Sequence, residues 1–212
     1  MIRLARAEDR AALYDICVRT GWSGADATGR YDDEELLGHV YVGPYLALAP
    51  ELALVATLDD DPDGRPQGYC LGAADSAAFA ERCERLWWPP LRARYPRDSP
   101  RRATDQSLVV LIHEPDSMPA AVVARYPAHL HIDLLPTMQG VGMGRALIER
   151  MLAALSDAGS PGVHLGVSAD NAHAIGFYRR LGFHEVGHGP GSVLMACELG
   201  AGPGQSERTR SR

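Results

Sequence analysis

One stretch limits the possible folds more than any other: an extended apolar segment followed by a glycine-rich turn and a helix. Residues 129–145 read HLHIDLLPTMQGVGMGR, and the helix-forming run ALIERMLAAL follows. Gly140, Gly142 and Gly144 permit a sharp turn and a close approach of the backbone to a ligand, because they carry no Cβ. The free amides of the first helical turn and the positive end of the helix dipole point into that turn. The segment therefore predicts an anion site at a helix N-terminus.

The length of the chain and its composition predict one globular domain. A chain of 212 residues is long enough to bury a core without metal or disulfide support. We expect a single domain over residues 1–199, with an insertion at about residues 76–127. Residues 200–212 have no apolar side chain larger than alanine, so we expect a disordered tail.

Charge and cysteine content exclude several classes of protein. The formal net charge of −6 argues against a general binder of nucleic acid or of membrane surfaces. No apolar run reaches the roughly 18 residues of a membrane span, and MIRLARAEDR at the start lacks a signal-like apolar region. We therefore expect a soluble cytoplasmic protein. The cysteines form no metal or redox pair, so we expect reduced core thiols and no metal site; they are Cys17, Cys70, Cys83 and Cys197.

Periodicity and turn residues predict alternating strands and helices along the chain. Strands are expected around Ile2 to Leu4, at 51–58, 67–74, 129–135, 162–168, 183–188 and 192–199. Helices are expected from about Glu8 to Thr20, from Asp32 or Asp33 to near Gly43-Pro44, from Ser76 to an interruption at Pro89-Pro90, at 118–126, after the glycine turn and at 171–181. The run SLVVLIHEP inside the insertion must be buried. The acidic run Asp59 to Asp61 fails the calcium-loop pattern and is interpreted as a solvated turn.

Two features of the chain permit more than one interpretation. Trp22 lies in a turn-rich loop, 21–29, that either shapes a substrate side or packs internally. Arginines concentrate in the insertion, where they form either an anion-contacting surface or, as we favour, a solvated helix face. These arginines are Arg82, Arg85, Arg92, Arg94, Arg97, Arg101 and Arg102.

The glycine turn differs from the two most familiar phosphate loops. It ends in Gly144-Arg145 where a nucleotide triphosphatase loop requires Gly-Lys-Ser/Thr, and its spacing is not G-x-G-x-x-G. Gln139-Gly140-x-Gly142-x-Gly144 resembles the pyrophosphate loop Q/R-x-x-G-x-G/A of the GNAT superfamily of N-acyltransferases. The segment from Asn171 to Phe183, NAHAIGFYRRLGF, is similar to the second coenzyme A motif of that superfamily.

The resemblance implies a fold of the α/β (α+β) class. Its centre is a mixed, mostly antiparallel seven-stranded sheet that splays after the fourth strand, with helices on both faces. Most of residues 1–199 also looks like the acetyltransferase-like C-terminal domain of eukaryotic O-GlcNAc hydrolases and its bacterial relatives. The eukaryotic domain lacks the glycine loop and is regarded as a pseudo-acetyltransferase, whereas this sequence has the loop. Glycosidase activity is not implied.

The same resemblance assigns residues to acetyl-coenzyme A as cosubstrate, without a metal. Main-chain groups of Leu134 and Leu135 would face the pantetheine arm. Pro136 would end the strand and so leave a cleft for this arm. Asn171 would bond the arm through its side chain, Phe177 belongs to the second motif, and Tyr178 would protonate the departing thiolate. Main-chain amides would hold the pyrophosphate; they belong to Gln139, Gly140, Val141, Gly142, Met143, Gly144 and Arg145.

The strand before the turn offers candidate bases. An amine attacks only when neutral, and a lysine with a pKa near 10.4 is almost wholly protonated at pH 7, so a base or water relay must remove a proton. Because side chains alternate along a strand, His129, His131 and Asp133 share one face. We rank Asp133 first and His131 second, and His113 and Glu114 are weaker candidates. For each histidine a structural role is at least as well supported.

Two functions from different classes follow from these assignments. The favoured one is an N-acetyltransferase that acts on a primary amine, either a small molecule or a protein lysine. The alternative is a coenzyme A-binding, non-catalytic module that recognises a protein or peptide through Trp87-Trp88 and the arginine-rich insertion. Neither needs nucleic acid or a membrane, and both permit a monomer or a homodimer.

Overall fold

A seven-stranded mixed sheet forms the centre of the part of the chain that the computed structural model describes, residues 1–200. Its order is β1-β2-β3-β4-β5-β7-β6, and every neighbouring pair is antiparallel except β4 and β5. The strands are β1 (Ile2–Leu4), β2 (Ala53–Thr57), β3 (Pro66–Ala73), β4 (Ala128–Leu134), β5 (Gly162–Ser168), β6 (His184–Gly189) and β7 (Ser192–Glu198). The predicted sheet and the predicted hairpin β2-β3 are confirmed.

The two parallel strands separate soon after they meet. Their register contains two positions, Ala128 with Val163 and His129 with His164. Beyond them β4 continues to Leu134 beside β3, while β5 continues to Ser168 beside β7. The predicted splay after the fourth strand is therefore confirmed, and it leaves one edge of β4 without a strand partner.

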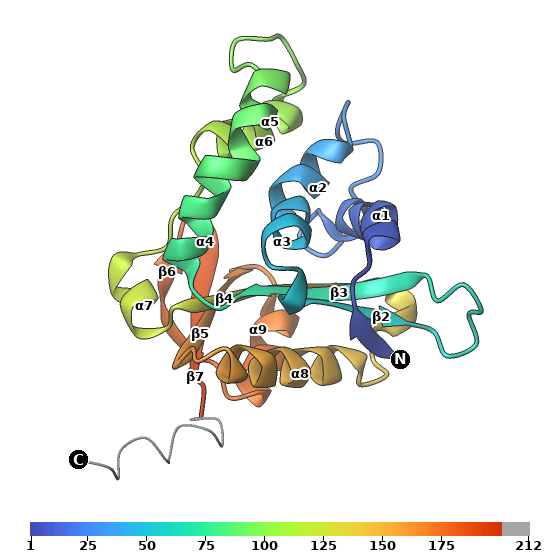
Figure 1. Cartoon of the computed structure of the whole chain (residues 1–212), viewed down its shortest axis with the longest axis vertical. Coiled ribbons are helices and arrows are strands. Elements are labelled where there is room, and N and C mark those ends of the chain that lie inside the picture. Colours follow the sequence, from blue (N-terminus) through green and yellow to red (C-terminus); the bar gives the residue numbers. More distant parts are fainter. Residues whose placement is uncertain (201–212) are drawn as a thin grey trace.

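Helices cover both faces of the sheet (Figure 1). One face carries α8 (Met143–Asp157), whose Leu147, Ile148, Met151 and Leu155 recur at helical spacing and are fully buried. The opposite face carries α1 (Arg10–Thr20), α2 (Glu35–Tyr41) and α3 (Gly43–Leu48). The last helix, α9 (Ala172–Arg180), shares the hydrophobic cluster of α8 through Tyr178. Each face of the sheet thus buries its own core.

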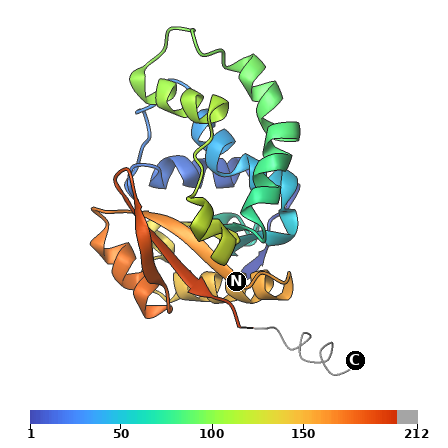
Figure 2. The ribbon, with the colours of Figure 1, turned by 90° about the vertical axis from the view of Figure 1, so that its left-hand side faces the viewer.

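The insertion between β3 and β4 is helical and stands on the side of α1 to α3 (Figures 1 and 2). It contains α4 (Ser76–Arg82), α5 (Trp88–Arg94), α6 (Ala103–His113) and α7 (Ala120–Arg125). The predicted helix at 118–126 corresponds to α7. The run SLVVLIHEP lies largely in α6, where Leu108, Val109 and Ile112 are buried as predicted.

The predicted break at Pro89-Pro90 has a different form. The chain passes from α4 through a π-helical turn, Cys83–Trp87, into α5, and both prolines lie in the first turn of α5. Prolines are tolerated there because the first N–H groups of a helix have no internal partner. Pro44 explains a second difference, since it opens α3 where we expected a helix to end.

Both tryptophans and several arginines of the insertion contact other residues of the same chain. Trp88 is buried, and Trp87 is half-buried with its indole N–H donating to the carbonyl of His39 at 2.9 Å. Several arginines pair with carboxylates, which supports a solvated helix face rather than an anion-binding surface. These pairs are Arg92 with Glu84, Arg94 with Glu35, Arg97 with Glu114 and Arg102 with Asp32.

Further predictions concern cysteines, membrane spans and the chain end. All four cysteines are buried and free, as predicted. Within residues 1–200, no helix combines the length and apolarity needed to cross a bilayer. The predicted tail lies, apart from its first residue, outside the described residues.

Candidate functional site

The glycine turn joins the end of β4 to α8 through a 3₁₀ turn, Pro136–Met138. Gly140 and Gly142 have φ values of 74° and 84°, the left-handed region that favours glycine. A Cβ at either position would meet no atom within 4 Å, so the backbone is open to a ligand. Gly144 is enclosed instead, because a Cβ there would lie 3.2 Å from Leu134 and 3.4 Å from Phe177.

The amides of this turn are available to an anion. Residues 139–142 are exposed, and Gly142 is the N-cap of the 15-residue helix α8. Among the described residues, none of the amides of 140–145 donates a hydrogen bond, and the first helical hydrogen bond begins at Ala146. Free amides at a helix N-terminus are suited to phosphate. The residues present therefore fit the pyrophosphate of coenzyme A.

The free edge of β4 presents main-chain groups of Leu134 rather than of Leu135. The amide of Leu135 donates to the carbonyl of Gln67 on the β3 side at 2.9 Å, and its carbonyl accepts from the amide of Met138. Because successive strand residues point their main-chain groups to alternate sides, those of Leu134 point into the splay. The side chain of Gln139 donates to the Leu134 carbonyl at 2.8 Å and so fixes the start of the turn.

Helix α9 borders the splay with the residues of the second predicted motif. Asn171 caps the helix, since its Oδ1 accepts from the amide of Ala174 at 3.0 Å. Its Nδ2 donates to no group among the described residues. Tyr178 is 9% exposed, and its hydroxyl makes no hydrogen bond to any described residue. Burial, reinforced by Cys70 and Asp133, raises the pKa of Tyr178, so its hydroxyl keeps its proton.

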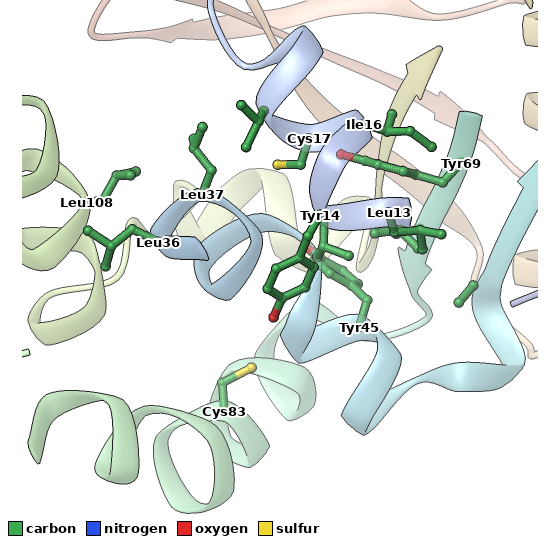
Figure 3. Packing of buried hydrophobic residues seen from close by; sticks show 14 of the residues in the cluster. Leu13, Tyr14, Ile16, Cys17, Leu36, Leu37, Tyr45, Tyr69, Cys83 and Leu108 are labelled. Atoms are coloured by element: carbon green, nitrogen blue, oxygen red, sulfur yellow. The ribbon is translucent and has the colours of Figure 1, made fainter. Parts of the chain in front are cut away.

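A cavity of about 180 Å³ opens on the other face of the sheet. Its walls come from α1, α2, β3, β4, the loops beside these helices and α6 of the insertion. Figure 3 labels four of the lining residues, Cys17, Leu37, Tyr69 and Leu108, among the side chains of the hydrophobic cluster on this face. The lining residues are Cys17, Gly21, Tyr31, Leu37, Tyr41, Tyr69, Leu108, His131 and Asp133.

Asp133 is the acidic group of this cavity. The hydroxyl of Tyr69 donates to its Oδ2 at 2.5 Å, from the paired position on β3. Burial raises the pKa of Asp133 to about 6, against the opposing effect of the Tyr69 hydrogen bond. The carboxyl is therefore largely ionised at neutral pH, yet accepts a proton more readily than an exposed aspartate.

The histidines differ from Asp133 in their chemistry. His131 lines the cavity, but burial lowers its pKa to about 4, with a contribution from His164, so it is a weaker base. His129 is held by the hydroxyls of Tyr45 at 2.8 Å and Ser76 at 2.7 Å, an arrangement with a structural role. Burial, with His131 and His164, lowers its pKa well below the usual range.

The two weaker base candidates lie away from the cavity lining. His113 contacts the carbonyl of Tyr95, and Glu114 pairs with Arg97, both within the insertion. Within residues 1–200, no group of three or more His, Cys, Asp or Glu side chains is arranged to hold a metal ion.

The walls of the cavity were not predicted from the sequence. Tyr31, Tyr41 and Leu108 read as ordinary core or surface positions of separate helices and loops. Tyr69 could be linked to Asp133 only through the β3-β4 register, which requires knowing that these strands pair.

Trp22 is 46% exposed and lies under the guanidinium of Arg30, in the loop whose Gly24 approaches the amide nitrogen of Asn171.

Comparison with known proteins agrees with this geometry. Residues 80–183 match the model of the acetyltransferase (GNAT) family. The crystal structure of SsHAT is 42% identical with a TM-score of 0.86, over 94% of this chain and 98% of that chain. Protein O-GlcNAcase of Rattus norvegicus is 25% identical over 182 residues, which are 84% of this chain and 19% of the relative. The chain thus spans about a fifth of that relative's length.

A more distant structure shows the same fold. A GNAT superfamily phosphinothricin acetyltransferase from Sinorhizobium meliloti, in complex with AcCoA, is 17% identical with a TM-score of 0.57. The alignment covers 96% of this chain and 90% of that structure's chain. The predicted resemblances to the superfamily and to O-GlcNAc hydrolases are confirmed. This chain belongs to the acetyltransferase (GNAT) family.

Proposed function

We propose that the protein transfers an acetyl group from acetyl-coenzyme A to a primary amine. One observation carries the proposal: β4, which separates from β5 after His129, leads into the free amides at the start of α8 and also places the Asp133 carboxylate in the lining of a cavity. A cosubstrate bound along the free edge of β4 would lie between the two. Family membership supports the same reaction class.

The cosubstrate side is formed by the glycine turn and α9. Acetyl-coenzyme A supplies the acetyl group as a thioester. Main-chain groups of Leu134 and the free Nδ2 of Asn171 would bind the amide-bearing arm. The amides from Gly140 to Arg145 would bind the pyrophosphate, and Phe177 would support the turn by packing beside Gly144.

Proton transfer is assigned to two side chains, one that accepts a proton and one that donates a proton. Asp133 accepts a proton from the acceptor ammonium, directly or through water, and so frees the nitrogen lone pair. The nitrogen then bonds to the acetyl carbon as the carbon–sulfur bond breaks, and the sulfur keeps the electron pair. Tyr178 gives that sulfur a proton, the new amide nitrogen loses its second proton to water, and water returns a proton to Tyr178. Its raised pKa keeps it protonated until it is needed.

Binding and turnover test separate parts of the proposal. Acetyl-coenzyme A should release heat on binding in calorimetry and raise the melting temperature of the protein. A panel of amines should then release free thiol in a reaction that Tyr178→Phe and Asp133→Asn both slow strongly. Absence of binding at millimolar concentration would remove both the transferase and the non-catalytic module.

The non-catalytic alternative has less structural support than the sequence indicated. Trp88 is buried and Trp87 bonds to the backbone of α2, so neither forms the predicted recognition surface. Binding of acetyl-coenzyme A without thiol release from any amine would nonetheless favour that alternative.

A further inference from the structure

The acceptor cavity is small and is bordered on one side by the insertion. Its volume, about 180 Å³, is below the roughly 300–1,000 Å³ of sites for drug-sized ligands. Leu108 of α6 is one of its walls, and it is 4% exposed. Asp105 of the same helix accepts from the amides of Asp32 and Asp33 at 3.0–3.1 Å, next to Tyr31. The insertion thus supplies a fixed wall of a cavity that has room for a small molecule.

Charge in the cavity has a single sign. Asp133 is its only residue that is charged at neutral pH, because His131 is neutral and burial raises the pKa values of Cys17 and Tyr41 to about 12. No arginine belongs to the lining, and the chain contains no lysine. A cation finds a partner in this space, whereas a carboxylate or phosphate would be desolvated beside a like charge.

The remaining walls suit an uncharged body. Leu37, Leu108 and the rings of Tyr31 and Tyr41 provide apolar surface and aromatic faces that attract a nearby ammonium. The hydroxyl of Tyr69 is already directed to Asp133. Asp133 and Tyr69 therefore supply the charged and hydrogen-bonded part of the lining, and the other walls are largely aromatic and aliphatic, with the neutral His131 beside Tyr41.

We propose that the acceptor is a small primary amine whose only charge is its ammonium group and whose body is aromatic or aliphatic. This inference rests on the proposed transferase function and names the substrate class of the same site. Its ammonium lies at Asp133 and its body lies among the tyrosines and leucines. Amino acids, phosphorylated amines and protein lysines are poor acceptors.

A matched pair of amines tests the charge argument. Tyramine and tyrosine differ by one carboxylate, so thiol release is measured with each, and with a lysine-containing peptide. We expect a kcat/KM at least about 100-fold higher for tyramine than for tyrosine, since like charges oppose binding. Because the chain has no lysine, self-acetylation is confined to its N-terminal amine and leaves a low background.

One substitution should reduce this preference by about 100-fold. Tyr41 lines the cavity and is 36% exposed, so Tyr41→Arg adds a cation with little disturbance to the core. It should weaken the tyramine reaction by about tenfold and improve the tyrosine reaction by a similar factor. Tyr41→Gln controls for loss of the ring. Val110→Arg adds the same charge at an exposed position of α6 outside the lining and should change neither ratio.

The outcomes separate the two proposals. Preference for the peptide, or equal rates for tyramine and tyrosine, would overturn the acceptor class while the transferase function stands. If no amine releases thiol, the transferase function fails, and calorimetry of tyramine and tyrosine with the coenzyme A complex decides the cavity's selectivity. Tyramine that binds no tighter than tyrosine would overturn the inference.

Discussion

The two halves of the candidate site are built in opposite ways. The cosubstrate half consists mainly of main-chain groups from two short segments, residues 134–145 and 171–178, and its turn is exposed. The acceptor half consists of side chains from α1, α2, β3, β4 and α6, brought together only by folding. In the proposed function, the first half recognises phosphates that many molecules share, whereas the second half selects the acceptor by shape and charge.

The halves also differ in their effect on stability. Exposed amides in the glycine turn are satisfied by water and cost the fold little. Asp133 is half-buried, and desolvation raises its pKa from 3.8 to about 6. At about 1.4 kcal/mol per pKa unit, the ionised carboxylate destabilises the folded protein by about 3 kcal/mol at neutral pH. The stability sacrificed for function is therefore concentrated on the acceptor side.

Asp133→Asn gives the largest expected effect and separates activity from stability. The amide keeps the hydrogen bond from Tyr69 but accepts no proton, so kcat should fall by about 100- to 1,000-fold. The free energy of unfolding at pH 7 should rise by about 2–3 kcal/mol, because a partly desolvated charge is removed. Urea titration measures the free energy of unfolding. Calorimetry measures the affinity for acetyl-coenzyme A, which should not change. A destabilised variant with weakened acetyl-coenzyme A binding would contradict the division between the halves.

Gly142→Val tests the cosubstrate half through the backbone alone. At φ 84° a β-branched residue is strained, although a Cβ at this position would meet no atom within 4 Å. Displaced amides should raise the Kd of acetyl-coenzyme A by about 100-fold in calorimetry. Gly159→Val is the matched control, because Gly159 has a φ of 88° and equal free space at the other end of α8. An equal change in Kd for both variants would show that strain, not the turn, is measured.

The pH dependence of turnover follows from the same carboxyl group. Since Asp133 must be ionised, kcat/KM should fall below about pH 6 and reach about a tenth of its plateau near pH 5. His131→Gln should leave this acid limb in place, because a pKa of about 4 puts His131 outside the range. If the acid limb of the kcat/KM profile shifts in His131→Gln, His131 rather than Asp133 is the better candidate base.

Stability should depend on pH with a definite sign. The unfolded chain releases the Asp133 proton near pH 3.8, whereas the folded protein keeps it to about pH 6. The folded state binds more protons between these values, so this group lowers stability as pH rises through the window. The difference in unfolding free energy between wild type and Asp133→Asn should therefore grow from pH 4 to pH 6 and then remain constant. A constant difference across the window would show that the pKa is not raised.

The sequence predicts the backbone geometry of the proposed cosubstrate half well because the determinants are local. The glycine positions fix φ, Pro136 ends a strand, and the two motifs lie on either side of one opening. Leu135 shows the limit even there, since its main-chain groups are used by Gln67 and Met138. Which side of a strand stays free depends on register, and a single segment does not contain that information.

The acceptor half could not be predicted for the same reason. Only Asp133 and His131 were identified, from their alternation on β4, whereas Tyr69, Tyr41 and Leu108 reach the cavity through strand pairing and helix packing. We predicted that helices end or break at Pro44 and at Pro89-Pro90, whereas in the structure helices begin at these prolines. Proline breaks a helix interior but favours the first turn, and the choice depends on the preceding residues.

Asp105→Asn gives the smallest expected effect and tests whether the insertion belongs to the acceptor half. The buried carboxylate accepts from the amides of Asp32 and Asp33, and an amide nitrogen in place of one oxygen would face these donors. Stability should fall by about 2 kcal/mol, and the KM for the amine should rise about threefold to tenfold as Tyr31 loses its fixed position. The Kd of acetyl-coenzyme A should stay constant. Asp98→Asn, at an exposed position of the same insertion, should change none of these values. A rise in the acetyl-coenzyme A Kd without a change in amine KM would place the insertion with the cosubstrate half instead.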